Sequence, residues 1–174
     1  MKGLREANGR CSPMSTVPEK FAVFLEDPEQ TRRLGAALMK VLGPGDALAL
    51  TGQLGAGKST LVAGIAEALG SPHPAASPTF GILHEHDTEP PLYHFDAYRL
   101  ERPEEFEHIG GEDYLYGRGI SVVEWAEKLG EYLPVRRIEI RMEHVDGCRS
   151  AEVRALPEGD GAQMQLRNAL ICSG

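Results

Sequence analysis

The feature that most restricts the fold of this chain is a glycine-rich loop at residues 52–60, with the sequence Gly-Gln-Leu-Gly-Ala-Gly-Lys-Ser-Thr. It fits the phosphate-binding pattern G-x-x-x-x-G-K-[ST], which has meaning only when a strand precedes it and a helix follows it. Residues 47–51 form a short apolar run, typical of a strand that is buried on both faces. After the loop, apolar residues recur at helical spacing and a glycine ends the pattern; they are Leu61, Val62, Ile65, Ala68, Leu69 and then Gly70. The loop is therefore predicted to bind a nucleotide rather than to be an ordinary glycine-rich turn.

The residue types in this loop suit the binding of a polyphosphate. Glycines can adopt backbone angles that are closed to residues with a Cβ, so consecutive N–H groups can turn inward around an anion. The helix that begins near Lys58 adds its unpaired N–H groups and the positive end of its dipole. Lys58 is predicted to reach the β- and γ-phosphates, and the Ser59 hydroxyl to bind Mg²⁺. The predicted cofactor-binding residues of the loop are Gly52, Gln53, Leu54, Gly55, Ala56, Gly57, Lys58, Ser59 and Thr60.

Composition limits the class of protein. A chain of 174 residues is long enough for one domain with a sizeable core. A formal net charge of −8 disfavours an extended basic groove for DNA or RNA, so any contact with RNA would need a local patch or a partner. The three cysteines are scattered, which disfavours a disulfide framework. No apolar signal segment or membrane-spanning run is present, and we expect a soluble, reduced, cytoplasmic protein.

The order of the predicted elements indicates an α/β domain. Residues 1–18 are polar and without periodicity and are expected to form a disordered tail, while residues 19–174 form one domain. Strands are predicted at 21–25, 47–51, 79–84, 92–96 and 120–124, and a hairpin of alternating residues at 138–155 turns at Asp146-Gly147. Helices are predicted after the N-cap Asp27, after the glycine-rich loop, after Pro103 and at 164–171. This pattern predicts a P-loop NTPase-like fold: a mostly parallel sheet flanked by helices, with a C-terminal antiparallel hairpin.

Two acids end predicted strands and are candidates for the chemistry at the phosphates. Asp96 ends the apolar run at 92–95, and Glu124 ends the run at 120–123. Ligands of open α/β sheets gather at the carboxyl ends of strands, where a carboxylate can serve Mg²⁺ or the attacking water. A carboxylate that simply faces solvent is the alternative for each. Lys58, Asp96 and Glu124 are the predicted catalytic residues.

Other residues allow more than one interpretation. Thr79, twenty residues after Ser59, could complete the Mg²⁺ shell or be an ordinary loop threonine. Three histidines near Asp96 suggest zinc, but no closed four-ligand set is apparent; they are His84, His86 and His94. Trp125 could pack in the core or lie near the nucleotide. Since the chain lacks the Asn-Lys-x-Asp pattern that reads guanine, ATP is predicted.

Taken together, these motifs resemble one family, the bacterial P-loop ATPase of tRNA threonylcarbamoyladenosine biosynthesis, called TsaE or YjeE. The resemblance rests on the loop at 52–60, on Ser-Pro-Thr-Phe at 77–80, on Tyr-His-Phe-Asp-Ala-Tyr-Arg-Leu at 93–100 and on Val-Glu-Trp at 123–125. Two further segments between the last two motifs, at 103–106 and 110–114, fit the same order. His-Phe-Asp-x-Tyr-Arg followed by Val-Glu-Trp is far more specific than the loop alone.

The resemblance implies an ATPase that is weak alone and joins two partners of the sugar-kinase fold, TsaD and TsaB. That complex places a threonylcarbamoyl group on adenosine-37 of tRNA, and ATP hydrolysis is thought to reset it between turnovers. By motif match, Ser59 and Thr79 would be hydroxyls on the Mg²⁺ side, and Asp96 and Glu124 the acids for metal and water. Trp125 would lie beside the nucleotide. The tRNA would be reached only through the complex, with no part for DNA or a membrane.

Two positions depart from the family pattern, and two rival functions remain open. The family usually has aspartate where Gln53 stands and threonine where Ser59 stands. A small-molecule kinase would usually show an arginine-rich lid, whereas Arg99, Arg102 and Arg118 are separated and form no clear cluster. Nothing in the sequence resembles an arginine finger placed over the chain's own γ-phosphate. A nucleotide-gated binding module would bind ATP without positioning a water for attack. The acids at Asp96 and Glu124 disfavour this function mildly.

Overall fold

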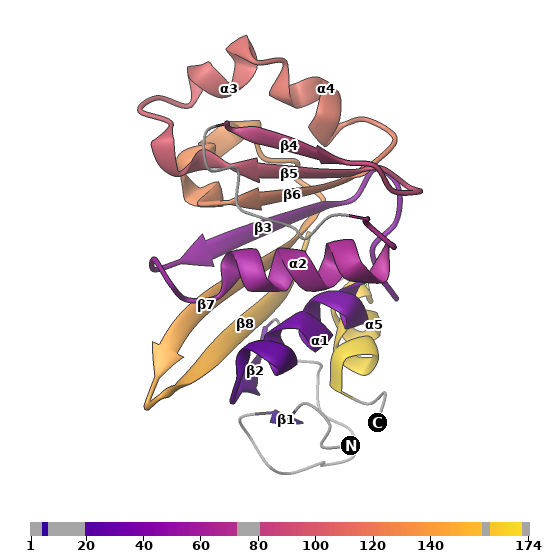
Figure 1. Ribbon diagram of the computed structural model, residues 1–174, viewed down its shortest axis with the longest axis vertical. Helices are drawn as coiled ribbons and strands as arrows, with labels where there is room; N and C mark the ends of the chain where they lie inside the picture. The colour runs from indigo at the N-terminus through magenta and orange to yellow at the C-terminus, as the bar shows by residue number, and fades with distance from the viewer. Residues whose placement is uncertain (1–4, 7–19, 73–80, 158–160, 172–174) are drawn as a thin grey trace.

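The computed structural model describes residues 5–6, 20–72, 81–157 and 161–171, and one sheet runs through all of these ranges except the last (Figure 1). The sheet has eight strands in the order β1-β2-β8-β7-β3-β6-β5-β4. The strands are β1 (Arg5–Glu6), β2 (Phe21–Leu25), β3 (Ala47–Gly52), β4 (Leu83–His86), β5 (Leu92–Asp96), β6 (Ile120–Glu124), β7 (Arg137–Val145) and β8 (Cys148–Leu156). Because β1 pairs with β2, Arg5–Glu6 has a place in the sheet. The rest of the predicted tail at 1–18 lies outside the described residues.

The four central strands, β7, β3, β6 and β5, are parallel to one another. Antiparallel pairs extend this core on both sides: β8 and β2 follow β7, and β4 follows β5. The predicted α/β P-loop fold with a parallel core and a C-terminal hairpin is thereby confirmed. The strand expected at 79–84 lies later, at β4, because the chain pairs there with β5 from Leu83↔Phe95 to His86↔Leu92.

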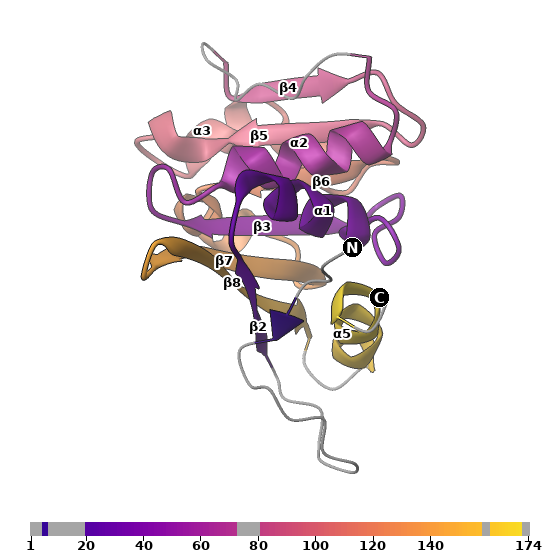
Figure 2. The same cartoon turned by 60° about the horizontal axis from the view of Figure 1, so that its bottom comes forward.

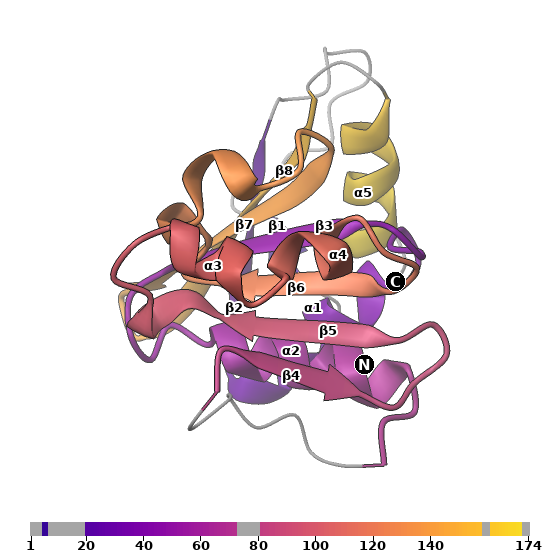
Figure 3. The same cartoon turned by 90° about the horizontal axis from the view of Figure 1, so that it is seen from above.

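Helices cover both faces of the sheet. On one face, α1 (Pro28–Leu38), α2 (Lys58–Ala68) and α5 (Ala162–Ile171) enclose the larger core, and α5 packs beside α1 (Figures 1 and 2). On the other face, α3 (Glu104–His108) and α4 (Gly111–Leu115) cover β5 and β6, away from α1 and α2 (Figure 3). Single 3₁₀ turns, η1 (Ala97–Arg99), η2 (Ala126–Lys128) and η3 (Gly130–Tyr132), follow β5 and β6. None of the helices in the described ranges has the length and apolar character needed to cross a bilayer.

Two helix boundaries illustrate how far local sequence decides the structure. The Asp27 carboxylate accepts a hydrogen bond from the Gln30 N–H at 2.7 Å and Pro28 opens the first turn, as predicted for α1. The helix predicted after Pro103 forms as α3. Gly110 then turns the chain with a φ of 70°, and a second short helix, α4, begins at Gly111, which was not predicted.

In the larger core, α1 and α2 approach each other closely, and glycines make this possible. A Cβ at Gly64 would overlap the carbonyl oxygen of Arg32, and one at Gly35 would overlap that of Leu61. The backbones of the two helices therefore touch at these two points. Since α2 begins directly after the phosphate loop, this contact fixes the position of the helix end that faces the site.

We expect Gly64→Ala to destabilise the fold. In a helix without neighbours, alanine would stabilise by up to about 1 kcal/mol relative to glycine. At this crossing the added methyl group must push α1 and α2 apart, which we expect to lower the free energy of unfolding by about 1–3 kcal/mol. Urea unfolding followed by circular dichroism measures the change. Gly43→Ala is the matched control, because the nearest atom to a Cβ there is the Asp46 carboxylate at 3.9 Å. A Gly64→Ala protein as stable as the wild type would contradict this account of the crossing.

Candidate functional site

The predicted site residues come together where the parallel strands end. In the register of the sheet, Glu124 at the end of β6 lies opposite Leu50 of β3 and opposite Asp96 at the end of β5. The phosphate loop leaves β3 directly after that point. The carboxyl ends of three neighbouring strands therefore deliver the loop and both acids to one edge of the sheet, as the rule for open α/β sheets requires.

The loop has the backbone conformation that its glycines predict. Gly52, Gly55 and Gly57 have φ angles of 127°, 80° and 104°, which residues with a side chain rarely adopt. Beside the loop lies a hollow of about 210 Å³. Its lining comprises Leu54, Gly55, Gly57, Lys58, Ser59, Thr60, Asp96, Tyr98, Glu124, Trp125 and Arg149. Six of the nine predicted loop residues thus line a single hollow with both acids and Trp125.

Lys58 is held inside the curve of its own loop. Its ammonium donates to the carbonyl oxygens of Gly52 at 2.6 Å and of Gln53 at 2.9 Å, and the side chain is almost fully buried. Burial lowers the pKa of the Lys58 ammonium, while the carboxylates of Glu124, Glu127 and Asp96 act in the opposite direction. The lysine is therefore a positioned donor for an anion that enters the hollow.

Trp125 forms the wall against which Lys58 rests. The Lys58 Nζ lies 4.0 Å from the centre of the indole, within the range of a cation–π contact. The backbone of Trp125 is left-handed, with φ 57° and ψ 41°, which is strained for a residue of this size. The ring of Tyr98 lies 5.0 Å from the indole and completes this wall. The turn after β6 thus aims the tryptophan into the site.

The Glu124 carboxylate is the most constrained group in the site. One oxygen, Oε2, accepts from the Ser59 hydroxyl at 3.1 Å, and the other, Oε1, accepts from the His94 Nε2–H at 2.9 Å. His94 is fully buried and Glu124 nearly so. A carboxylate in this position needs such donors, because burial without them would cost several kcal/mol. His94, whose role the sequence did not reveal, therefore orients Glu124 toward the loop.

Asp96 takes a second position at the edge of the hollow. It is half-buried, and its Oδ1 accepts from the Tyr98 N–H at 3.0 Å, which caps η1. The side chains of Ser59, Asp96 and Glu124 therefore bring oxygen atoms to the lining of the hollow. Oxygen donors of this kind fit Mg²⁺. Thr79, the fourth predicted ligand, lies outside the described residues.

The histidines near β4 have environments that differ from a closed zinc site. His94 uses Nε2 on Glu124, and the His86 and His94 rings stack at 6.2 Å. Burial, followed by the neighbouring His84 and His94, lowers the pKa of His86 from 6.5 to about 4. Over the residues that the structure describes, no three His, Cys, Asp or Glu side chains form a group that could hold a metal.

Arg149 is the site residue that the sequence analysis missed. It lies near the start of β8 and lines the hollow, although some ninety residues separate it from the loop. Only the pairing of β7 with β3 brings the hairpin tip to the phosphate loop, and sequence spacing contains no sign of that register. Arg149 therefore adds an arginine to the lining of the hollow that no sequence motif indicated.

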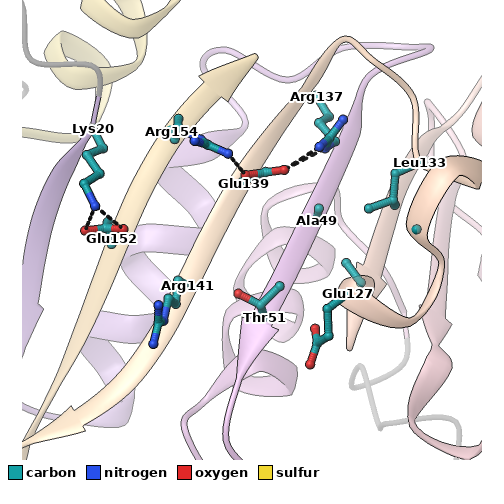
Figure 4. Close-up of a pocket in the computed structure, with 12 residues that line it drawn as sticks. Lys20, Ala49, Thr51, Glu127, Leu133, Arg137, Glu139, Arg141, Glu152 and Arg154 are labelled. Carbon is teal, nitrogen blue, oxygen red and sulfur yellow. Dashed lines mark hydrogen bonds and ion pairs between the residues drawn. The ribbon is translucent and has the colours of Figure 1, made fainter. Parts of the chain in front are cut away.

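A larger hollow, of about 390 Å³, lies on the face of β3 that is turned away from α1 and α2 (Figure 4). It is a weaker candidate for the functional site. Its charged side chains neutralise one another: Glu139 pairs with Arg137 and Arg154, both at 2.6 Å. Burial alone would raise the pKa of Glu139, but the hydrogen bonds from the two arginines outweigh it and the pKa is lowered. Lys20 and Glu152 form another pair at 3.0 Å. The smaller hollow, with its converging donors, is the candidate functional site.

Comparisons with known proteins place the chain among characterised relatives. A family model described as "Threonylcarbamoyl adenosine biosynthesis protein TsaE" matches residues 25–151. A tRNA threonylcarbamoyladenosine biosynthesis protein TsaE from Bacillus subtilis is 44% identical over 115 residues, which are 66% of this chain and 72% of that protein. Its namesake from Nostoc sp. is 39% identical over 144 residues, or 79% and 88% of the two chains. The crystal structure of Bacillus subtilis YdiB matches with a TM-score of 0.70 and 32% identity, over 89% of this chain and 97% of that one.

The lowered pKa of His86 predicts a loss of stability in mild acid. Below pH 6.5 the unfolded chain binds a proton at this histidine, whereas the folded chain binds it only near pH 4. Stability contributed by the neutral ring is therefore complete above pH 6.5 and is lost as the pH falls toward 4, by up to about 2 kcal/mol at pH 5.

Urea unfolding at pH 7 and pH 5 checks this on three proteins. His86→Phe removes the titrating group, so its stability should fall less between the two pH values than that of the wild type. His108→Gln, at an exposed histidine, is the matched control and should behave like the wild type. Equal pH dependence in all three proteins would refute the assignment.

Proposed function

Since this chain belongs to the TsaE family of threonylcarbamoyl adenosine biosynthesis proteins, we propose that it is a Mg²⁺-dependent ATPase that supports this modification of tRNA. The observation that carries the ATPase proposal is the buried Glu124 carboxylate, held between Ser59 and His94 at the mouth of a phosphate loop. A carboxylate held in a fixed direction at this place is suited to orienting a water for hydrolysis.

Binding would begin at the loop. The backbone N–H groups of the loop and of the first turn of α2 would surround the β- and γ-phosphates, and the Lys58 ammonium would neutralise part of their charge. Ser59, Asp96 and Glu124 would hold Mg²⁺, with Thr79 as a further candidate. When bound, Mg²⁺ would neutralise charge on the phosphate oxygens and orient them. Trp125 and Tyr98 would form a wall of the nucleotide site.

Hydrolysis would depend on the direction of the Glu124 carboxylate. The hydrogen bond from Ser59 would hold Oε2 on the side proposed for magnesium, and the hydrogen bond with His94 holds Oε1. A water near this group would be polarised and oriented by a carboxylate that cannot relax away. Asp96, which is tied to the turn of η1, would act from the other side of the hollow on the metal or its water.

The partners proposed for this chain are TsaD- and TsaB-like proteins, in the cytoplasm. The net charge of −8 favours protein partners over a direct, extensive contact with tRNA. ATP hydrolysis in such a complex would reset it after each transfer of a threonylcarbamoyl group to adenosine-37. The chain would then influence tRNA only through the complex.

Lys58→Ala and Glu124→Gln separate binding from hydrolysis. We expect Lys58→Ala to lose the charge on the phosphates, at a cost of roughly 2–5 kcal/mol, and to bind ATP too weakly for turnover. Glu124→Gln should bind ATP within a few-fold of the wild type and hydrolyse it at least tenfold more slowly, about 1.4 kcal/mol of barrier. Calorimetry and phosphate release measure the two steps, and chelation of Mg²⁺ should stop hydrolysis in the wild type.

The matched controls are Lys40→Ala and Glu131→Gln, since both side chains are exposed and lie outside the hollow. Full ATP affinity in Lys58→Ala would end the nucleotide-site proposal. Wild-type turnover in Glu124→Gln, together with an inactive Asp96→Asn, would exchange the proposed roles of the two acids.

Reconstitution tests the proposed biological role. With TsaD- and TsaB-like partners and a tRNA that carries adenosine-37, we expect several modified tRNAs per complex only when wild-type protein and ATP are present. Lys58→Ala and Glu124→Gln should support one round at most, because the transfer itself would occur on the partners. Multiple turnovers without this chain, or phosphorylation of a metabolite by this chain alone, would favour a small-molecule kinase instead.

A further inference from the structure

We propose that Arg149 binds a phosphate group of the nucleotide, so that the β7–β8 hairpin supplies a second cation to the site from within the same chain. This inference rests on the proposed nucleotide-binding function and extends it to a residue outside the phosphate-loop motif. Three observations carry it: the position of Arg149 against the loop, its unpaired buried nitrogen, and the anchoring of the hairpin.

The Arg149 side chain runs directly along the phosphate loop. A Cβ built at Gly57 would lie 3.1 Å from the Arg149 Cδ and 3.2 Å from its Nε, closer than ordinary side-chain contacts. The same arginine lines the hollow with Lys58 and Ser59. A side chain at Gly57, the second glycine of the loop pattern, would therefore crowd the Arg149 side chain.

The guanidinium has no acidic partner in the described part of the chain. Its Nε is buried and makes no hydrogen bond there, and no carboxylate lies within ion-pair distance. Other arginines of the same hairpin pair with glutamates, among them Arg141 with Glu143 at 2.6 Å. A buried donor on a charged group is costly unless an anion satisfies it. Among the described residues, Arg149 therefore differs from these other arginines of the hairpin in having no carboxylate partner.

Phosphate is the anion that fits this position. Both carboxylates of the hollow have other contacts: Glu124 accepts from Ser59 and His94, and Asp96 accepts from the Tyr98 N–H. The planar guanidinium matches the geometry of phosphate oxygens and forms short, charge-assisted hydrogen bonds with them. Arg149 and Lys58, from β8 and α2, would thus meet the same polyphosphate.

The hairpin is held in place before any ligand binds. The register of β3 with β7 places Gly52 beside Met142, and the His144 Nε2 lies 3.0 Å from the Gly55 carbonyl oxygen. His144 is paired in register with Arg149 across the hairpin. Two contacts with the loop therefore fix the strand ends that carry the arginine, and little ordering is required when a phosphate arrives.

Calorimetry with two probes, ATP and inorganic tripolyphosphate, tests the proposal on the full chain. We expect Arg149→Gln to weaken both ligands at least tenfold, and Arg149→Lys, which keeps the charge but not the fork, to weaken them less. Arg141→Gln is the matched control: it removes the same charge from the same hairpin and should bind both ligands within twofold of the wild type. Thermal unfolding of each variant shows that the hairpin is intact.

The outcomes are distinct. If the wild type binds neither probe, the proposed nucleotide site itself fails. If the wild type binds both and Arg149→Gln binds them equally well, only the role of Arg149 is overturned. A loss for ATP without a loss for tripolyphosphate also overturns it, because the arginine would then contact the nucleoside rather than a phosphate.

Discussion

The site depends on one buried carboxylate. Glu124 lies at the end of a strand that is covered on both faces, where an ionised group is stable only with hydrogen-bond donors on its oxygens. Ser59 and His94 supply them from α2 and β5. Because these three residues come from three elements, the carboxylate is satisfied only if the parallel register of the sheet and the position of the phosphate-loop helix are both correct. The same strand register and helix position are therefore needed both for a stable fold and for a correctly arranged site.

The surrounding scaffold fixes the loop from two further sides. Behind it, α2 is set by glycine contacts with α1, so that the helix end cannot shift without separating two backbones. Beside it, the hairpin is joined to the loop through the Met142 pairing and through His144. The proposed polyphosphate site would gain from such fixed surroundings, since groups that are already placed lose little freedom on binding. The rigid contacts are therefore concentrated where charge must be positioned.

Sequence predicted the features that are local. The N-cap of α1, the Asp146-Gly147 turn and the strand–loop–helix context each depend on a few consecutive residues, and the structure contains all three. Acids at strand ends were found because fold rules connect such positions to ligand sites. The contacts of His94 and Arg149 were not predictable, since they follow from strand register between segments far apart in the chain. Spacing had suggested zinc for the histidines, whereas pairing in the sheet gives His94 a carboxylate partner.

Lys58 shows how fixed geometry and affinity are linked. Its ammonium already donates to two carbonyl oxygens of the loop and rests on the indole of Trp125, so an entering anion must compete with these contacts. The left-handed backbone that holds Trp125 in place costs about 1–3 kcal/mol for a residue of this kind. Part of the binding free energy between the Lys58 ammonium and an anion is thus offset by the loss of its contacts with the loop. A lysine held by these contacts meets the anion from a defined direction, at the cost of weaker binding. The Glu124 carboxylate is restrained in the same way: its two hydrogen bonds fix its direction and limit its freedom to move toward a ligand.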